Sequence, residues 1–114
     1  MKSTRYYSDE QEKQIQKLLG GRITSNSGGT KFGGGDVLTD SFLIEAKTTT
    51  TKKGSFSIKN EWLLKAKEQA FEQGKDHYSL AFQFEPGGCN YFIIDENSMK
   101  EYLELLKEKK DEVR

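Results

Sequence analysis

The chain has 114 residues, a formal net charge of zero, one cysteine and one histidine, with 33% hydrophobic and 32% charged residues. These values predict one domain, residues 1–114, with a modest core, and they exclude an intramolecular disulfide and a cysteine–histidine zinc cluster. No apolar run approaches the roughly 20 residues of a membrane span, and the N-terminus lacks the apolar region of a signal peptide. We therefore expect a cytoplasmic or otherwise intracellular protein that does not bind membranes.

The first predicted element is a helix from Ser8 to about Leu19. Ser8 and Gln11, three residues later, have the spacing of a capping box. The glycine pair 20–21 is a typical helix end.

One acid on this helix is a candidate site residue. Glu12, Ile15 and Leu19 share a helix face. A carboxylate on an apolar face is costly to bury unless a bound cation compensates it, so we select Glu12 as a metal ligand. Glu10 stays open as the alternative, although its place in the first turn is explained by the helix dipole.

A short strand is predicted at 22–24, followed by a loop, 25–35, rich in Ser, Asn and Gly. Backbone amides and hydroxyls in such a loop can surround a phosphate, and an ordinary surface loop is the alternative. The candidate nucleic-acid contacts here are Arg22, Ser25, Ser27 and Lys31. No Gly-Lys-Ser/Thr follows the glycines, which excludes a nucleotide-binding P-loop.

Two strand-like pieces, 36–38 and 42–47, flank a turn-like 39–41. Alternation puts Leu43, Glu45 and Lys47 on one face of the second piece, and its other face is expected to be core. A hairpin would bring Asp36 towards Glu45, at a cross-strand distance of roughly 5 Å.

Two carboxylates at that distance repel each other unless a divalent cation joins them. Lys47, one pleat further along, would hold or polarise an attacking water. Asp36, Glu45 and Lys47 together are the minimal equipment for cutting a phosphodiester bond. The plain alternative is a solvated strand face, which often carries a Glu and a Lys.

Asp36, eight intervening residues and Glu45-Ala46-Lys47 resemble the core motif of the PD-(D/E)XK nuclease superfamily, with Gly35 in place of the proline. The layout of residues 8–94 is most similar to the archaeal and viral-type Holliday junction resolvases. This resemblance implies a restriction-endonuclease-like core, with Mg²⁺, or Mn²⁺ in its place, held by Asp36, Glu45, the Ala46 carbonyl and Glu12. It implies a homodimer that cuts branched or double-stranded DNA, and it is compatible with a phage or archaeal origin.

The charge is polarised along the chain. Residues 46–75 contain seven basic and three acidic residues, whereas residues 95–114 contain five basic and seven acidic ones. Thr48, Lys52, Lys53 and Lys59 are the candidates in the positive part for phosphate contacts that do not read sequence.

The remaining predicted elements are a helix from about 57 to 73, strands at 78–84 and 91–94, and a last helix capped by Asn97 or Ser98. His77 is expected at the start of a strand. The order α-β-β-β-α-β-β-α predicts an α/β fold with a mixed central β-sheet flanked by helices.

Three functions remain in competition. The first is a junction-selective endonuclease, and the second is another endonuclease of the superfamily, of restriction, nicking or repair type. The third is a non-catalytic nucleic-acid-binding module, which the joint presence of Asp36, Glu45 and Lys47 disfavours. A chain of 114 residues leaves little room for segments that read bases, which favours recognition of DNA shape.

Overall fold

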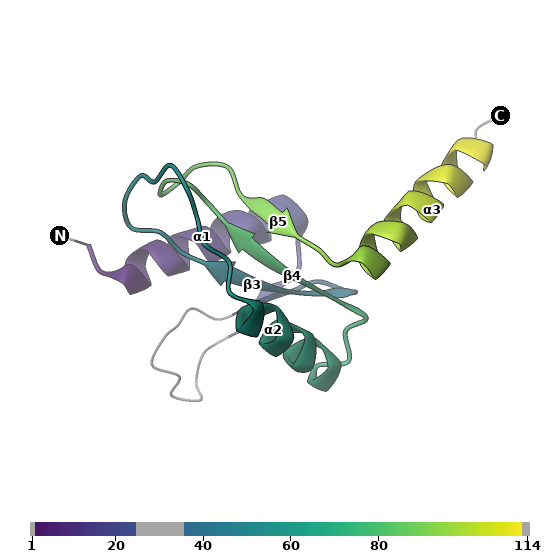
Figure 1. Cartoon of the computed structure of the whole chain (residues 1–114), viewed down its shortest axis with the longest axis horizontal. Helices are drawn as coiled ribbons and strands as arrows, with labels where there is room; N and C mark the ends of the chain where they lie inside the picture. Colours follow the sequence, from purple (N-terminus) through teal and green to yellow (C-terminus); the bar gives the residue numbers. More distant parts are fainter. Residues whose placement is uncertain (1, 25–35, 113–114) are drawn as a thin grey trace.

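A computed structural model describes residues 2–24 and 36–112. Within these residues the chain forms three helices and five strands in the order α-β-β-β-α-β-β-α, an α/β fold as the sequence predicts (Figure 1). The elements are α1 (Thr4–Leu19), β1 (Arg22–Ile23), β2 (Asp36–Leu38), β3 (Phe42–Lys47), α2 (Asn60–Glu72), β4 (His77–Phe82), β5 (Tyr91–Ile93) and α3 (Glu96–Glu112).

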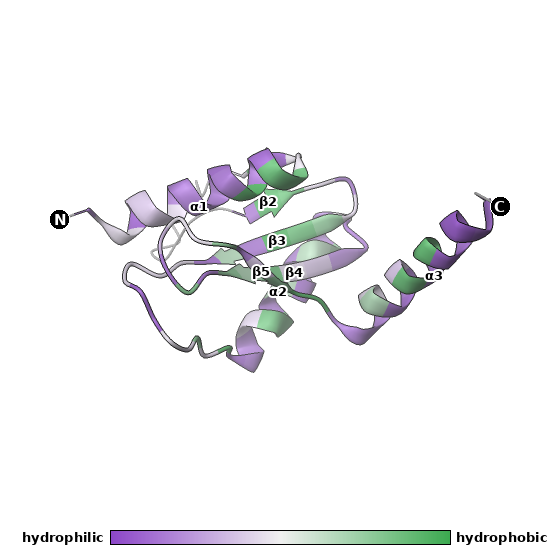
Figure 2. Ribbon diagram, turned by 90° about the horizontal axis from the view of Figure 1, so that it is seen from above, coloured by the Kyte–Doolittle hydropathy of each residue, from purple (hydrophilic) through white to green (hydrophobic). Residues whose placement is uncertain are grey.

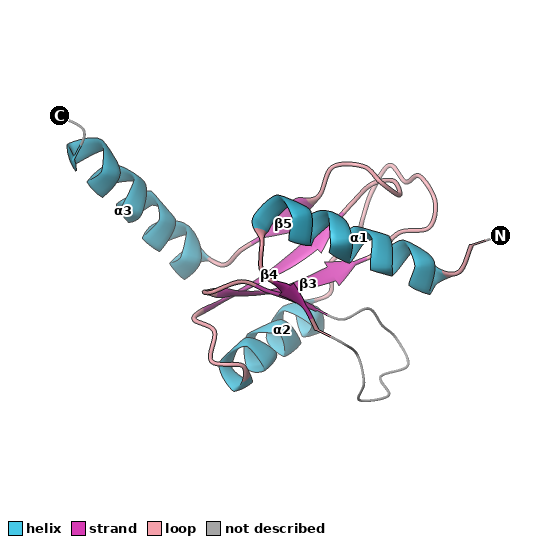
Figure 3. Ribbon diagram, turned by 180° about the vertical axis from the view of Figure 1, so that it is seen from behind, coloured by secondary structure: helices cyan, strands magenta, loops and turns pink. Residues whose placement is uncertain are grey.

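The strands form a mixed sheet in the spatial order β1-β2-β3-β4-β5. The β1–β2, β2–β3 and β4–β5 pairs are antiparallel, and β3 and β4 are parallel. Parallel neighbours need a crossover connection, and α2 supplies it. Helices α1 and α2 lie on opposite sides of the sheet, as Figure 3 shows from behind.

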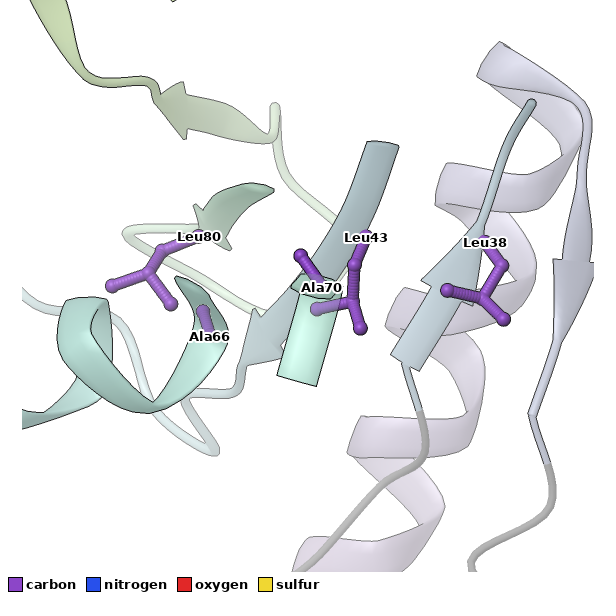
Figure 4. Packing of buried hydrophobic residues seen from close by; sticks show 5 residues of the cluster. All are labelled: Leu38, Leu43, Ala66, Ala70 and Leu80. Carbon is purple, nitrogen blue, oxygen red and sulfur yellow. The ribbon is translucent and has the colours of Figure 1, made fainter. Parts of the chain in front are cut away.

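Each face of the sheet has its own apolar cluster. Under α2 the buried residues are Leu38, Leu43, Ala66, Ala70 and Leu80 (Figure 4). Under α1 they are Ile15, Val37, Ile44 and Ala81. Because successive strand residues point to opposite faces, a strand covered on both sides is apolar at both parities. The sequence prediction of one core face on β3 is therefore incomplete, since Leu43 is core as well.

The predicted start of the first helix at Ser8 is wrong. The helix begins at Thr4, because the side chain of Ser3 accepts a hydrogen bond from the Tyr6 backbone N–H at 3.1 Å and acts as the N-cap. Ser8 lies one turn inside the helix and donates its hydroxyl to Glu12 Oε2 at 3.1 Å. No helix-breaking residue separates the two serines, so the helix extends to the earlier cap.

The predicted cap of the second helix near residue 57 is also wrong. Helix α2 begins at Asn60, with Lys59 as an N-cap that makes no side-chain hydrogen bond. The preceding segment is held elsewhere, because the Lys53 backbone N–H donates to the Phe84 carbonyl at 2.7 Å. Strand β4 ends at Phe82, two residues before the predicted end.

Helix α3 begins at Glu96, before the predicted caps Asn97 and Ser98. Asp95 acts as the cap, since its Oδ1 accepts from the Ser98 backbone N–H at 2.9 Å. This hydrogen bond lowers the pKa of Asp95. Over residues 2–24 and 36–112, none of the helices combines the length and apolar character needed to cross a membrane.

Candidate active site

The hairpin of β2 and β3 brings two carboxylates together. Asp36 lies directly opposite Glu45 in the antiparallel register, so the predicted cross-strand pairing is confirmed. Burial, together with the charge of neighbouring Glu45, raises the pKa of Asp36 to about 6 against the opposing charges of Lys65 and Lys47. Asp36 thus resists ionisation, first because it is desolvated and second because another carboxylate stands beside it.

Lys47 lies on the same face of β3 as Glu45. Its Nζ is 3.5 Å from Glu45 Oε1 and 4.3 Å from the centre of the Trp62 ring. The ammonium group is therefore held between a carboxylate and the face of an indole. The other Glu45 oxygen, Oε2, is buried and has no hydrogen-bond partner among the described residues. A buried, unpartnered carboxylate oxygen is a position that a cation would satisfy.

Two residues of α2 complete this surface and were missed in the sequence. Trp62 is partly buried and packs against the apolar cluster under α2, and the centre of its ring lies 5.8 Å from Lys59 Nζ. Lys65, one turn later, is close enough to lower the pKa of Asp36. The spacing of Trp62 and Lys65, three residues apart on the helix after the Glu-x-Lys strand, was the available signal.

Glu12 is buried, as its helix face predicted, with 2% of its surface exposed. Burial is the main cause that raises its pKa to about 7; the hydrogen bond from Ser8 opposes this rise, and the charges of Asp9 and Asp36 contribute to it. Glu10, the alternative acid, is exposed. Ser8 provides part of the compensation that the sequence analysis assigned to a metal.

Glu12 stands apart from the carboxylate pair. Among residues 2–24 and 36–112, no three His, Cys, Asp or Glu side chains form a group that could hold a metal ion. Asp36 shares the α2 face with Leu38 by strand alternation, whereas Glu12 belongs to the helix on the opposite face. The two acids influence each other through charge rather than as a close ligand set.

Thr24 fixes the backbone of Asp36. The Asp36 N–H donates to the Thr24 hydroxyl oxygen at 2.8 Å, and the Thr24 N–H donates to the Asp36 carbonyl at 2.9 Å. No pattern in the sequence identified this contact. The predicted phosphate contacts Ser25, Ser27 and Lys31 lie outside the described residues.

The other predicted DNA contacts differ in whether their side chains are exposed or already hydrogen-bonded within the protein. Arg22, Lys52, Lys53 and Lys59 are exposed. Thr48 instead donates its hydroxyl to Oε1 of buried Gln11 at 2.9 Å. This hydrogen bond joins the segment after β3 to α1, so the Thr48 hydroxyl hydrogen is engaged within the protein.

No family model, curated protein or solved structure matches this chain. The chemistry of the site therefore rests on its own residues: two paired acids, an ammonium group beside them and exposed lysines on the following segment.

Proposed function

We propose that the chain is a metal-dependent DNA endonuclease with a restriction-endonuclease-like core, and that it resolves Holliday junctions as a homodimer. The observation that carries this proposal is the β2–β3 register, which pairs Asp36 with Glu45 and leaves Lys47 on the same face of the sheet.

The residues present fit a hard divalent cation. Mg²⁺, with Mn²⁺ as a substitute, prefers oxygen ligands, and Asp36, Glu45 and the Ala46 carbonyl would supply them. A cation at this position would favour the ionised form of Asp36, whose pKa is raised, and would give the unpartnered Glu45 Oε2 a partner. When bound, Mg²⁺ would supply Lewis-acid stabilisation of the charge that develops on the phosphate. Glu12 is proposed as the further acid of the site, coupled to Asp36 by charge.

Lys47 has the catalytic role in this proposal. Its ammonium group orients the attacking water and offsets negative charge in the transition state. Trp62 keeps the ammonium within reach when Glu45 is engaged elsewhere, because the attraction of the indole face does not depend on that carboxylate.

The substrate is proposed to be branched or double-stranded DNA. Exposed Arg22, Lys52, Lys53 and Lys59 would contact phosphates without reading bases; Ser25, Ser27 and Lys31 are retained in the same role. Two symmetric cuts in a four-way junction require two sites, hence a two-fold dimer. We place this activity inside the cell, where DNA and Mg²⁺ are available.

The test is cleavage of labelled four-way junctions, matched duplexes and single strands in Mg²⁺. Wild type is compared with Asp36→Asn and Glu45→Gln, and Asp40→Asn is the control because Asp40 is an exposed acid in the same hairpin. We expect paired nicks in the junction alone, lost in both site variants and retained in the control.

Two other results would replace the proposal. Cutting of plain duplex would favour an endonuclease of restriction, nicking or repair type. Junction binding without cleavage in either Mg²⁺ or Mn²⁺ would favour a non-catalytic nucleic-acid-binding module.

A further inference from the structure

Helix α3 projects away from the body of the protein (Figure 1). Five large side chains on it are between 40% and 56% exposed: Met99, Tyr102, Leu103, Leu105 and Leu106. At about 100° per residue they fall within one arc of less than half the helix circumference. We call this arc the α3 stripe. In Figure 2 hydrophobic residues are visible along α3, away from the sheet.

An apolar groove lies beside the first turns of α3. Its cavity volume is about 770 Å³, and its lining includes Leu19, Phe42, Ile44 and Phe92 together with Tyr102 and Leu105 of the helix itself. Phe42, Ile44 and Phe92 belong to the sheet face that α1 covers over β1, β2 and β3. The groove is thus the part of that face that α1 leaves open, next to an uncovered helix of the same chain.

The helix is held at the rim of the groove and is not free to fold into it. His77 Nδ1 is 2.8 Å from Ser98 Oγ, and His77 Nε2 is 3.1 Å from Glu101 Oε2. The Asp95 cap fixes the same turn. Folding α3 back over the sheet would break these contacts, so α3 of the same chain does not close the groove.

We propose that the occupant is α3 of a second copy of this chain. The two helices run antiparallel about a two-fold axis, and each stripe covers the partner's stripe and groove. A two-fold contact is self-complementary, and here helix and groove occur together on one chain. About half of five side chains of on the order of 200 Å² each gives roughly 500 Å² per helix. With the groove residues this approaches the roughly 800 Å² per partner of a stable interface.

The charges of α3 favour the antiparallel direction. Glu96 and Glu101 flank the N-terminal end of the stripe, whereas Lys109 and Lys110 continue its arc at the C-terminal end and outnumber Glu112 beside it. An antiparallel pair brings the lysines of one helix near the acids of the other at both ends of the interface. A parallel pair would bring like charges together.

This interface would supply the dimer that paired cuts require. The inference rests on the residues of α3 and the groove and not on the proposed nuclease activity. The test uses the full chain without DNA or metal. The dimer proposal can therefore fail while the nuclease proposal stands, and the nuclease proposal can fail while the dimer proposal stands.

The first experiment is sedimentation velocity from about 1 to 100 μM, a range that covers typical weak to moderate dimer affinities. Wild type is compared with Leu103→Glu/Leu106→Glu, and Phe71→Glu is the matched control because Phe71 is an 85% exposed apolar residue on α2. We expect wild type and control at twice the 13.0 kDa of one chain and the double variant at 13.0 kDa. Circular dichroism checks that the double variant, whose changes are in exposed positions, is folded.

The second experiment tests direction. Glu96→Lys and Lys110→Glu should each raise the dimer Kd several-fold, and the combined variant should restore it. A monomeric wild type at the highest concentration, or a folded Leu103→Glu/Leu106→Glu variant as dimeric as the control, would overturn the proposal. Failure of the combined variant to restore the Kd would overturn the antiparallel arrangement.

Discussion

Glu12 is buried and Asp36 is half-buried, and both acids have a raised pKa, but their surroundings differ. Asp36 faces a second carboxylate, and that carboxylate retains an oxygen without a partner among the described residues. Glu12 has its own hydroxyl donor, Ser8, within the same helix. Burial alone therefore does not mark a metal ligand. An acid whose neighbours repel it needs a cation more than an acid whose neighbours already hydrogen-bond to it.

The largest expected effect is a difference in junction cleavage between a variant of Asp36 and a variant of Glu12. Asp36→Asn should reduce junction cleavage by about 10³-fold or more, since it removes a proposed metal ligand, whereas Glu12→Gln should cost about 10-fold. Single-turnover cleavage at saturating Mg²⁺ measures both. Equal losses would show that the two acids act as one ligand set.

The pH dependence of stability should come from the same two acids. Both have folded-state pKa values above the ordinary range, about 6 for Asp36 and about 7 for Glu12. The folded protein therefore binds more protons than the unfolded chain between about pH 4 and 7. Their contribution is full below about pH 4 and is lost as the pH rises through 6 and 7.

We expect the metal-free protein to lose on the order of 2 kcal/mol of unfolding free energy between pH 5 and 8 from these groups. Urea denaturation at both pH values measures the loss, and it should be smaller in Asp36→Asn/Glu12→Gln. An equal pH dependence in wild type and the double variant would assign it to other residues.

Metal binding near pH 6.5 should release protons, because a ligand carboxylate must be ionised. Calorimetry with Ca²⁺ in buffers of different ionisation enthalpy measures this release without any cleavage. Most of it should disappear in Asp36→Asn and persist in Glu12→Gln. The opposite result would make Glu12 the principal ligand.

The smallest expected effect concerns Trp62, which is the single tryptophan of the chain. Its fluorescence should change on addition of Ca²⁺, since a cation at Glu45 would displace the Lys47 ammonium from its ion pair. The change should be absent in Lys47→Met. Trp62→Phe should lower cleavage only a few-fold, because a phenyl ring retains part of the attraction.

The sequence was informative where the deciding contacts are local. The alternation of β3, the turn at 39–41 and the acid spacing were sufficient to predict that Asp36 faces Glu45. The burial of Glu12 followed from its position on one helix face. The start of α1 was misjudged although its contacts are local, because two serines offered plausible caps and the sequence does not rank them.

Contacts between distant segments were not readable in this way. Thr48 was assigned to a phosphate, but its hydroxyl is bonded to Gln11, 37 residues away. The contact of Trp62 with Lys47 depends on how α2 crosses the sheet. Such pairings need the packed arrangement, because no spacing along one strand or helix encodes them.

The sequence by itself determined the order of elements, the α/β class and the pairing of the two acids, because periodicity and turn residues act within a few residues of each other. The tertiary structure decided which amphipathic helices have a partner. Helix α2 buries Ala66 and Ala70 against the sheet, whereas α3, with a similar apolar pattern, buries only Ser98 within its described residues. An apolar stripe in the sequence indicates a surface that packs against something. Only the fold shows whether another element of the same chain packs against it.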